Sequence, residues 1–186
     1  MKLPALVRLL RPAHWVKNGA VILPVIFAGR VFDAGAIVSA AAGFVIFCML
    51  SSAVYSINDV FDAEEDRHHP KKRLRPVASG QITPKAGLLA GGILAVSGLA
   101  LSILLGMSFL IFSAGYFFMQ LLYSAKLKSI VLLDVIIIAL GFVLRASAGA
   151  EAISVAISPW LFVCMFTLCL FMGFCKRYSE MVAIED

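Results

Sequence analysis

The sequence predicts an all-α membrane protein, in which a bundle of helices crosses a lipid bilayer. Its composition indicates this first, because 61% of the 186 residues are hydrophobic and only 15% are charged. Soluble domains are nearer half apolar and a quarter charged. The mean hydropathy of +0.96 agrees. In addition, the apolar residues form long blocks, and a helix that spans a bilayer needs about 20 of them.

These blocks predict six spans in a single membrane domain that covers residues 1–186. The first block is short and contains Pro24, and the fourth is also short. The third is rich in Gly, Ala and Ser, which let helices approach closely in lipid and so favour a packed bundle over separate anchors. The expected spans are residues 18–32, 34–57, 86–105, 108–123, 130–150 and 153–175.

Before the first span, the segment MKLPALVRLLRPAHWVKNG is basic and is interrupted by Pro4 and Pro12. It lacks the continuous apolar stretch of a cleavable signal peptide. We expect an amphipathic segment that lies on the membrane surface. A disordered basic tail is the alternative.

The basic residues predict how the spans are oriented. With six spans, all sixteen Lys and Arg except Arg30 and Arg145 flank the spans on one side. Cytoplasmic loops carry an excess of Lys and Arg, so both termini and the loop 58–85 are expected in the cytoplasm of a multi-pass cell-membrane protein. The same positions explain the net charge of +5 without nucleic acid as a partner.

This loop opens with the pattern N-D-x-x-D-x-x-x-D, formed by Asn58, Asp59, Asp62 and Asp66. At about 100° per residue, the three aspartates lie within an arc of about 60° if the preceding helix continues. Such carboxylates repel one another unless a cation lies among them. Mg²⁺ prefers oxygen ligands and often shares them with the phosphates of a substrate. The pattern therefore predicts a Mg²⁺ site at Asp59, Asp62 and Asp66.

A basic cluster, RHHPKKRLR, follows the aspartates directly. Arginine suits bidentate contacts with phosphate, so the cluster is a candidate phosphate-binding site. A solvated loop whose positive charge only sets the topology is the alternative. That alternative explains the acidic half less well, because acidic residues contribute little to topology.

Two charged residues, Asp134 and Arg145, fall inside the fifth span. A charge at the centre of a membrane helix costs about 2.5–3.5 kcal/mol on insertion scales. Eleven positions along a helix return to within about 20° of the same face after three turns. We therefore expect both residues to face one interior cavity. A structural partner on another helix is the alternative for each.

Three stretches together resemble the UbiA superfamily of intramembrane prenyltransferases. NDVFDAEEDRHHPKKRLRPVASGQIT is similar to the first aspartate-rich motif of that superfamily. LLRPAHWVKNGAVILP and LLYSAKLKSIVLLDVIIIALGFVLRASAG narrow the likeness to the decaprenyl-phosphate phosphoribosyltransferase branch. The likeness implies a Mg²⁺-dependent enzyme that transfers 5-phosphoribose from phosphoribosyl pyrophosphate to a polyprenyl phosphate. Pyrophosphate is released, and the product serves cell-envelope polysaccharide synthesis.

The resemblance also implies roles for single residues. Asp59, Asp62 and Asp66 are expected to bind Mg²⁺, and Asn58 to orient this catalytic group. For Lys128, simple anchoring at the positive side of the membrane is the alternative. The candidates for substrate binding are Lys17, Arg67, Arg73, Arg75, Tyr123, Lys126, Lys128, Asp134 and Arg145, followed after the sixth span by Lys176, Arg177 and Glu180.

Two departures from the superfamily pattern qualify this prediction. Members that prenylate aromatic acids carry a second aspartate-rich motif after the sixth span, where this chain reads CKRYSEMVAIED. The difference favours the phosphoribosyl branch over an aromatic-acceptor prenyltransferase that uses a prenyl diphosphate. The family fold has nine spans, and we expect the last three, from a longer chain, a homo-oligomer or a partner, to be needed for activity. A non-catalytic membrane subunit or transporter bundle is the remaining alternative.

Overall fold

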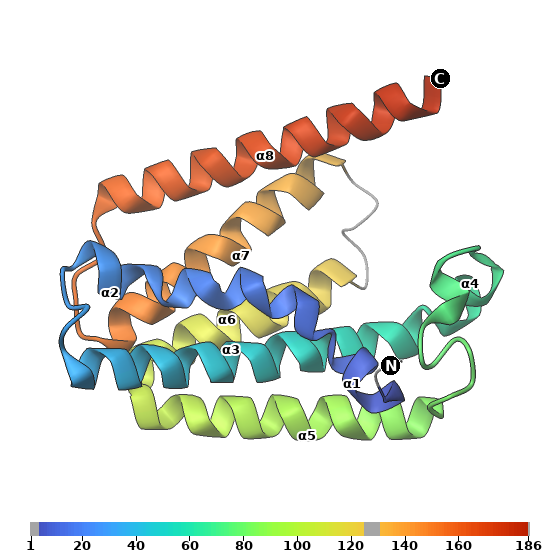
Figure 1. Cartoon of the computed structure of the whole chain (residues 1–186), viewed down its shortest axis with the longest axis horizontal. Helices are drawn as coiled ribbons and strands as arrows, with labels where there is room; N and C mark the ends of the chain where they lie inside the picture. Colours follow the sequence, from blue (N-terminus) through green and yellow to red (C-terminus); the bar gives the residue numbers. More distant parts are fainter. Residues whose placement is uncertain (1–3, 125–130, 186) are drawn as a thin grey trace.

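The computed structural model describes residues 4–124 and 131–185, and every regular element among them is helical (Figure 1). This confirms the all-α prediction. Only the backbone is described for residues 131, 176, 177 and 180–185. In chain order the helices are α1 (Ala5–Leu10), the 3₁₀ helix η1 (Pro12–Val21), α2 (Leu23–Phe27), α3 (Ala34–Phe61), α4 (Ala63–His68), η2 (Lys72–Leu74), α5 (Pro84–Ser102), η3 (Ile103–Leu105), α6 (Met107–Leu122), α7 (Val131–Ala152) and α8 (Pro159–Glu185).

Five apolar helical segments correspond to the second to sixth predicted spans. Three of them are long and apolar enough to cross a membrane, and two are shorter. The sixth predicted span is expected from residue 153, but its helix, α8, begins at Pro159. A proline disfavours helical backbone in the residue before it, which explains the later start. The count of six spans stays a prediction. The long segments are Ala34–Phe61, Pro84–Leu105 and Leu132–Ala152, and the shorter ones are Met107–Leu122 and Pro159–Cys175.

The prediction of one continuous span over residues 18–32 is wrong. The 3₁₀ helix η1 ends at Val21, α2 has only 5 residues, and Gly29 then adopts a φ of 68°. Pro24 explains the break. It has no N–H to donate, and its ring clashes with the carbonyl one turn earlier in a regular helix.

The N-terminal segment, which is expected on the membrane surface, packs against the bundle along one side, and its position relative to a membrane stays a prediction. Helix η1 contacts both α3 and α7, and Leu9, Asn18 and Val21 are fully buried. The polar groups of this segment find partners inside the protein. The indole N–H of Trp15, for example, donates to the hydroxyl of Ser52 at 3.0 Å.

Helices α3 and α5 lie side by side, with α6, α7 and α8 stacked beyond α3 (Figure 1). Gly87, Gly91 and Gly98 make the close approach of α5 possible. A Cβ added at these glycines would come within 2.8, 2.8 and 2.9 Å, respectively, of side chains on α3. Small residues at such contacts are typical of helix pairs in lipid. The predicted packing role of the third span is therefore confirmed.

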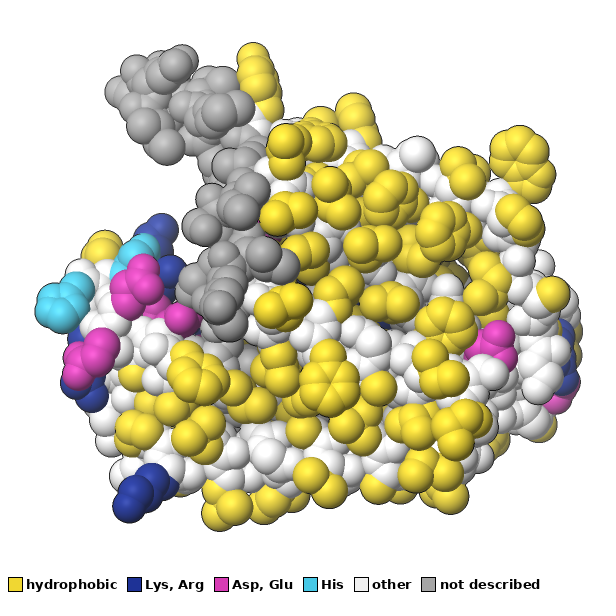
Figure 2. All heavy atoms as spheres, turned by 180° about the vertical axis from the view of Figure 1, so that it is seen from behind, with side chains coloured by type: hydrophobic (Ala, Val, Ile, Leu, Met, Phe, Trp, Pro, Cys, Tyr) yellow, Lys and Arg dark blue, Asp and Glu magenta, His cyan; other side chains and the backbone are white. Residues whose placement is uncertain are grey.

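The outer surface is apolar around the middle of the bundle. Figure 2 shows hydrophobic side chains across the centre of one face and charged side chains gathered toward its two ends. Leu89, Val96, Ile111 and Phe118 on α5 and α6 are all more than half exposed. Soluble proteins rarely expose contiguous apolar patches of this extent. The protein is therefore an integral membrane protein whose apolar belt faces lipid.

Candidate functional site

A cavity of about 510 Å³ lies between η1, α3, α6 and α7, and we call it the central cavity. Basic groups dominate its lining, because six of the described side chains that line it are basic and one is a carboxylate. Such a cavity suits an anionic ligand. The basic residues are Arg11, His14, Lys17, Lys72, Arg75 and Arg145, and the carboxylate belongs to Asp134.

The three aspartates that the sequence places on one stripe are divided in the structure. Helix α3 ends at Phe61, and Asp62 caps its C-terminus instead of continuing it. Asp59 and Asp66 are each 1% exposed, and Arg75 lies between them. Its guanidinium is 2.6 Å from the Asp66 carboxylate and 3.6 Å from that of Asp59. Arg75 thus stands where the stripe predicted a metal ion.

Arg11 supplies a second positive charge to this group. Its guanidinium donates to the Asp59 carboxylate at 2.5 Å and stacks over the ring of Tyr55 at 4.8 Å. Asp59 is therefore held by two arginines from different parts of the chain. Breaking a buried pair of this kind by removing one partner is costly, because the remaining charge is left without compensation.

Asn58 and Asp62 lie on another side of the end of α3. They share a pocket of about 550 Å³ with Phe61, Glu65 and Ser124. Asn58 also lines the central cavity, so it stands between the two spaces. None of the three aspartates lines the central cavity itself, and the role of Asn58 beside them stays a prediction.

The aspartates fit a divalent cation in their chemistry but not in this arrangement. Carboxylate oxygens are ligands that Mg²⁺ prefers, yet Asp59 and Asp66 are already neutralised by arginine. Within residues 4–124 and 131–185, no group of three His, Cys, Asp or Glu side chains is placed to hold a metal ion. A shared site would require these carboxylates to exchange their arginine partners.

The predicted phosphate-binding residues are only partly brought together. Lys17 and Arg75 line the central cavity. Arg67 instead pairs with Glu64 at 3.2 Å on the exposed side of α4, and Arg73 is exposed in η2 without lining the cavity. Lys126 and Lys128 lie outside the described residues, as do the side chains of Lys176, Arg177 and Glu180.

Asp134 and Arg145 both line the central cavity, as their spacing on α7 predicted. Each also has a partner on another element, which was the alternative expectation. The hydroxyl of Tyr123 donates to the Asp134 carboxylate. Arg145 donates to the side-chain oxygen of Asn18 at 2.9 Å and to the hydroxyl of Tyr116 at 2.7 Å. The two expectations are therefore compatible.

Several residues that line the central cavity are not among those predicted from the sequence. Arg11 and His14 were assigned to a surface segment. Burial lowers the pKa of His14 below its usual value, and the charges of Lys17 and Arg11 lower it further. Tyr116 and Gln120 lie in an apolar helix, but with Tyr123 they form a polar stripe at positions i, i+4 and i+7, a signal that could have been recognised.

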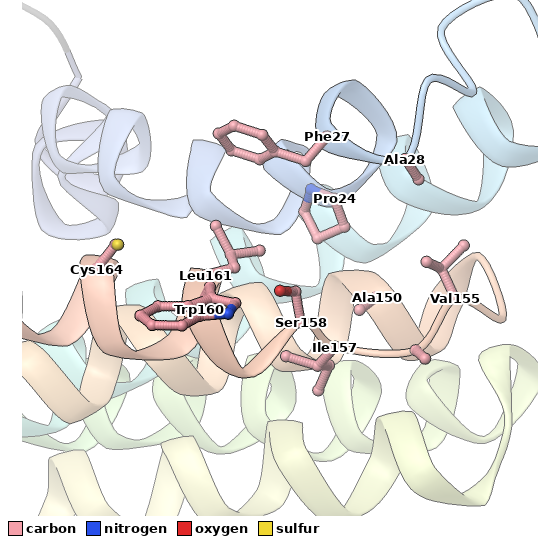
Figure 3. A pocket seen from close by; sticks show the side chains of 11 residues that line it. Pro24, Phe27, Ala28, Ala150, Val155, Ile157, Ser158, Trp160, Leu161 and Cys164 are labelled. Carbon is pink, nitrogen blue, oxygen red and sulfur yellow. The ribbon is translucent and has the colours of Figure 1, made fainter.

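A second pocket, of about 470 Å³, lies at the other end of the bundle, where α2 meets the start of α8 (Figure 3). Phe27, Leu161 and Trp160 contribute to its wall, and Ser158 supplies a hydroxyl. No charged side chain occurs among its described lining residues. Because phosphate recognition needs charge-assisted hydrogen bonds, the central cavity is the better candidate for the functional site.

The chain is similar to known proteins along most of its length. The chain is 37% identical over 184 residues to decaprenyl-phosphate phosphoribosyltransferase of Mycolicibacterium smegmatis. The aligned region covers 97% of this chain and 58% of that relative. It is also 37% identical over 190 residues to the protein of the same name from Corynebacterium glutamicum. That alignment covers 97% of this chain and 55% of the relative. The chain thus spans little more than half the length of these relatives.

The fold is that of solved UbiA structures. A UbiA homologue from Archaeoglobus fulgidus, bound to GPP and Mg²⁺, superposes with a TM-score of 0.81 at 22% identity over 95% of this chain and 64% of the other. The model of the UbiA prenyltransferase family matches residues 20–186. This match includes all of α3 to α8 and the greater part of the central cavity. The chain belongs to the UbiA prenyltransferase family.

Proposed function

We propose that this protein carries the site at which 5-phosphoribose is transferred from phosphoribosyl pyrophosphate to a polyprenyl phosphate such as decaprenyl phosphate. In this reaction an oxygen of the prenyl phosphate forms a bond to C1 of the ribose. The bond from C1 to the diphosphate breaks, and pyrophosphate leaves with the electron pair. No oxidant or reductant is needed, and an ionised phosphate attacks without a strong general base.

The observation that carries this proposal is the concentration of basic groups in one cavity of an otherwise apolar bundle. Both substrates are phosphates, and the acceptor is also a lipid. A membrane protein that binds them needs cations inside a cavity next to an apolar, lipid-facing surface. The likeness to two phosphoribosyltransferases over 97% of the chain supports the same substrates.

We assign the donor to the part of the cavity lined by Lys17 of η1 and by Lys72 and Arg75 of the η2 segment. Arg67 and Arg73 are next to this region in the sequence and stay candidates for contact with the leaving diphosphate. Tyr123, Asp134, Lys126 and Lys128 stay candidates for contact with either substrate at the end of α6 and the start of α7. Lys176, Arg177 and Glu180 stay candidates from α8.

We further propose Mg²⁺ as the cofactor, with Asp59, Asp62 and Asp66 as its protein ligands. A bound Mg²⁺ would neutralise the negative charge that develops on the leaving diphosphate. Asn58, which lines both the central cavity and the Asp62 pocket, would orient the donor. Arg75 is the residue that would have to leave Asp66 and turn to the phosphates.

For the membrane arrangement, we propose the cell membrane with both termini and the segment 58–85 in the cytoplasm. The soluble donor would then reach the cavity from the cytoplasm, and the acceptor would reach it from the bilayer. Further helices, from a longer chain, a second copy or a partner, would complete the cavity wall beside α8. These assignments rest on the distribution of Lys and Arg and on the length of the relatives.

Transfer of label tests the proposed function. Membranes that contain the product of the full reading frame are given phosphoribosyl pyrophosphate labelled in the ribose, together with decaprenyl phosphate. We expect labelled lipid and released pyrophosphate, both lost on omission of divalent cation. A parallel reaction with 4-hydroxybenzoate and a prenyl diphosphate tests the aromatic-acceptor alternative. Ring prenylation without labelled lipid would reject the proposal, as would the absence of both products.

A further inference from the structure

Arg145 is a buried cation, and each hydrogen-bond partner that the structure describes for it is neutral. It lies within α7 and is 6% exposed. Its three bonds go to the side-chain oxygen of Asn18 at 2.9 Å, the carbonyl oxygen of Gly141 at 2.9 Å and the hydroxyl of Tyr116 at 2.7 Å. The rings of Tyr116 and Phe142 lie 4.4 and 5.4 Å from the guanidinium carbon. These neutral groups stabilise the positive charge of the guanidinium but supply no negative charge to balance it.

The other two arginines of the central cavity differ in this respect. Arg11 pairs with Asp59, and Arg75 pairs with both Asp59 and Asp66. Among the side chains that the structure describes, no carboxylate forms an ion pair with Arg145. The cavity carboxylate, Asp134, begins the same helix, about 16 Å away along the axis at 1.5 Å per residue.

A buried charge normally requires an opposite charge, because taking an ion out of water costs several kcal/mol. Among the described side chains Arg145 has no such partner, but it faces a cavity that can admit an anion. A guanidinium has five N–H groups, and three of those of Arg145 are used. The two that remain suit the oxygens of a phosphate, which arginine binds bidentately.

The surroundings of Arg145 hold its guanidinium in place. Asn18 accepts from Arg145, while its own amide donates to the hydroxyl of Ser51 at 3.1 Å. The carbonyl oxygen of Gly141 fixes Nη1 of the guanidinium, from which it accepts at 2.9 Å. Pre-organisation of this kind reduces the entropy that a cation loses when it binds an anion.

We infer that Arg145, held by Asn18 and Tyr116, is the binding subsite for a phosphate monoester at the inner end of the central cavity. This subsite is separate from Arg11 and Arg75, whose charges are already matched. Only the identity of the ligand rests on the proposed function. The monoester is either the 5-phosphate of the donor or the phosphate of the lipid acceptor, and both present the same oxygens.

Binding measurements distinguish these two sources. The product of the full reading frame, in nanodiscs, is compared with its Arg145→Gln variant. Affinities are measured for phosphoribosyl pyrophosphate against ribose 1-diphosphate, and for polyprenyl phosphate against polyprenol. We expect Arg145→Gln to weaken one phosphate-bearing ligand about ten- to a hundredfold, as for the loss of a charged hydrogen bond. Its partner ligand, which lacks that phosphate, should bind the variant as it binds the wild type.

Inorganic phosphate serves as a third probe that does not depend on the proposed function. We expect it to raise the thermal unfolding midpoint of the wild type clearly more than that of Arg145→Gln. If phosphate does so while neither substrate binds, the subsite is supported and the proposed function fails. If a folded Arg145→Gln binds every ligand like the wild type, the inference is overturned. Equal weakening of ligands with and without the phosphate also overturns it, because that indicates a purely structural role.

Two further variants show whether a loss of binding comes from the subsite or from misfolding. Tyr116→Phe keeps the charge but removes the hydroxyl that orients Nη2, so we expect about a three- to tenfold loss that is confined to the phosphate-bearing ligand. Arg30→Gln is the matched control. Like Arg145, Arg30 donates to a backbone carbonyl, that of Ile153, but it pairs with the Asp33 carboxylate and lies at the other end of the bundle. We expect its loss to leave all affinities unchanged, and a loss as large as that of Tyr116→Phe would overturn the inference.

Discussion

Arg75 donates a 2.6 Å hydrogen bond to Asp66, which lies nine residues earlier in the chain and is 1% exposed. The same guanidinium lies 3.6 Å from Asp59. Two buried carboxylates of the aspartate pattern are therefore neutralised by a side chain of the basic cluster. The acidic and basic halves of the segment act on each other in this structure, before any phosphate or metal is considered.

Replacement of Arg75 by glutamine should destabilise the protein strongly. Asp66 would be left as a buried charge without a cation, and loss of one partner of a buried pair costs about 3–5 kcal/mol. Thermal unfolding in detergent or nanodiscs measures the effect. Arg67→Gln is the matched control, because Arg67 pairs with Glu64 on an exposed face, where such pairs contribute about 0–1 kcal/mol. Equal effects of the two substitutions would contradict the structural role of Arg75.

The same substitution should increase the affinity for a divalent cation. In the wild type a cation competes with the guanidinium for Asp66 and Asp59. Removal of a charge-assisted hydrogen bond worth about 1.5–3 kcal/mol should therefore improve Mn²⁺ binding about tenfold or more. Electron paramagnetic resonance of free Mn²⁺ measures this below the unfolding temperature of Arg75→Gln. Addition of Asp66→Asn should abolish the gain, and an unchanged affinity in Arg75→Gln would argue against these carboxylates as metal ligands.

The helices and their lengths follow from hydropathy, and the close packing of α5 on α3 follows from its glycines. The path of the first segment does not. Pro24 indicated a weak span, but the burial of Asn18 depends on Arg145 and Ser51, which lie 127 and 33 residues away. Hydrophobic periodicity contains no information on such long-range polar contacts, so the entry of η1 into the bundle could not be derived.

The site was likewise predicted in part. The spacing of Asp134 and Arg145 on one helix was enough to place both in one cavity, because a helix has a known period. The prediction that the three aspartates form one stripe requires the helix to continue past Asp59, but α3 ends at Phe61. The pairing of Arg75 with Asp66 depends on the turn through η2, whose path is set by tertiary packing rather than by periodicity.

His14 should make stability depend on pH. Burial, together with the charges of Lys17 and Arg11, holds the pKa of His14 below its usual value. The unfolded chain therefore binds the proton more readily. This contribution to stability is present above pH of about 6.5, the pKa of an unperturbed histidine, and is lost as the pH falls below that value.

Unfolding measured between pH 7.5 and 5.5 tests this, with the same titration of His14→Gln as the comparison. The wild type should lose more stability on acidification than the variant. A ligand phosphate in the cavity should reduce the difference, because a nearby anion favours the charged imidazole. Parallel pH profiles for the two proteins would show that His14 does not contribute.

Gly149→Ala should be among the most damaging single-methyl additions in the bundle. A Cβ at Gly149 on α7 would overlap the backbone carbonyl of Val21 at the end of η1. A backbone cannot move aside as a flexible side chain does. The free energy of unfolding should therefore fall by at least as much as overpacking typically costs, about 1–3 kcal/mol. Displacement of η1 would also separate Asn18 from Arg145, so phosphate binding should weaken together with stability.

Gly92→Ala on α5 is the matched control, since nothing lies within 4 Å of a Cβ added there. We expect it to be neutral or to stabilise by up to about 1 kcal/mol, because alanine is favoured over glycine inside a helix. Thermal unfolding and phosphate titration of both variants provide the comparison. If Gly149→Ala unfolds and binds like Gly92→Ala, then η1 does not lie against α7 as described, and the inner wall of the central cavity must be built differently.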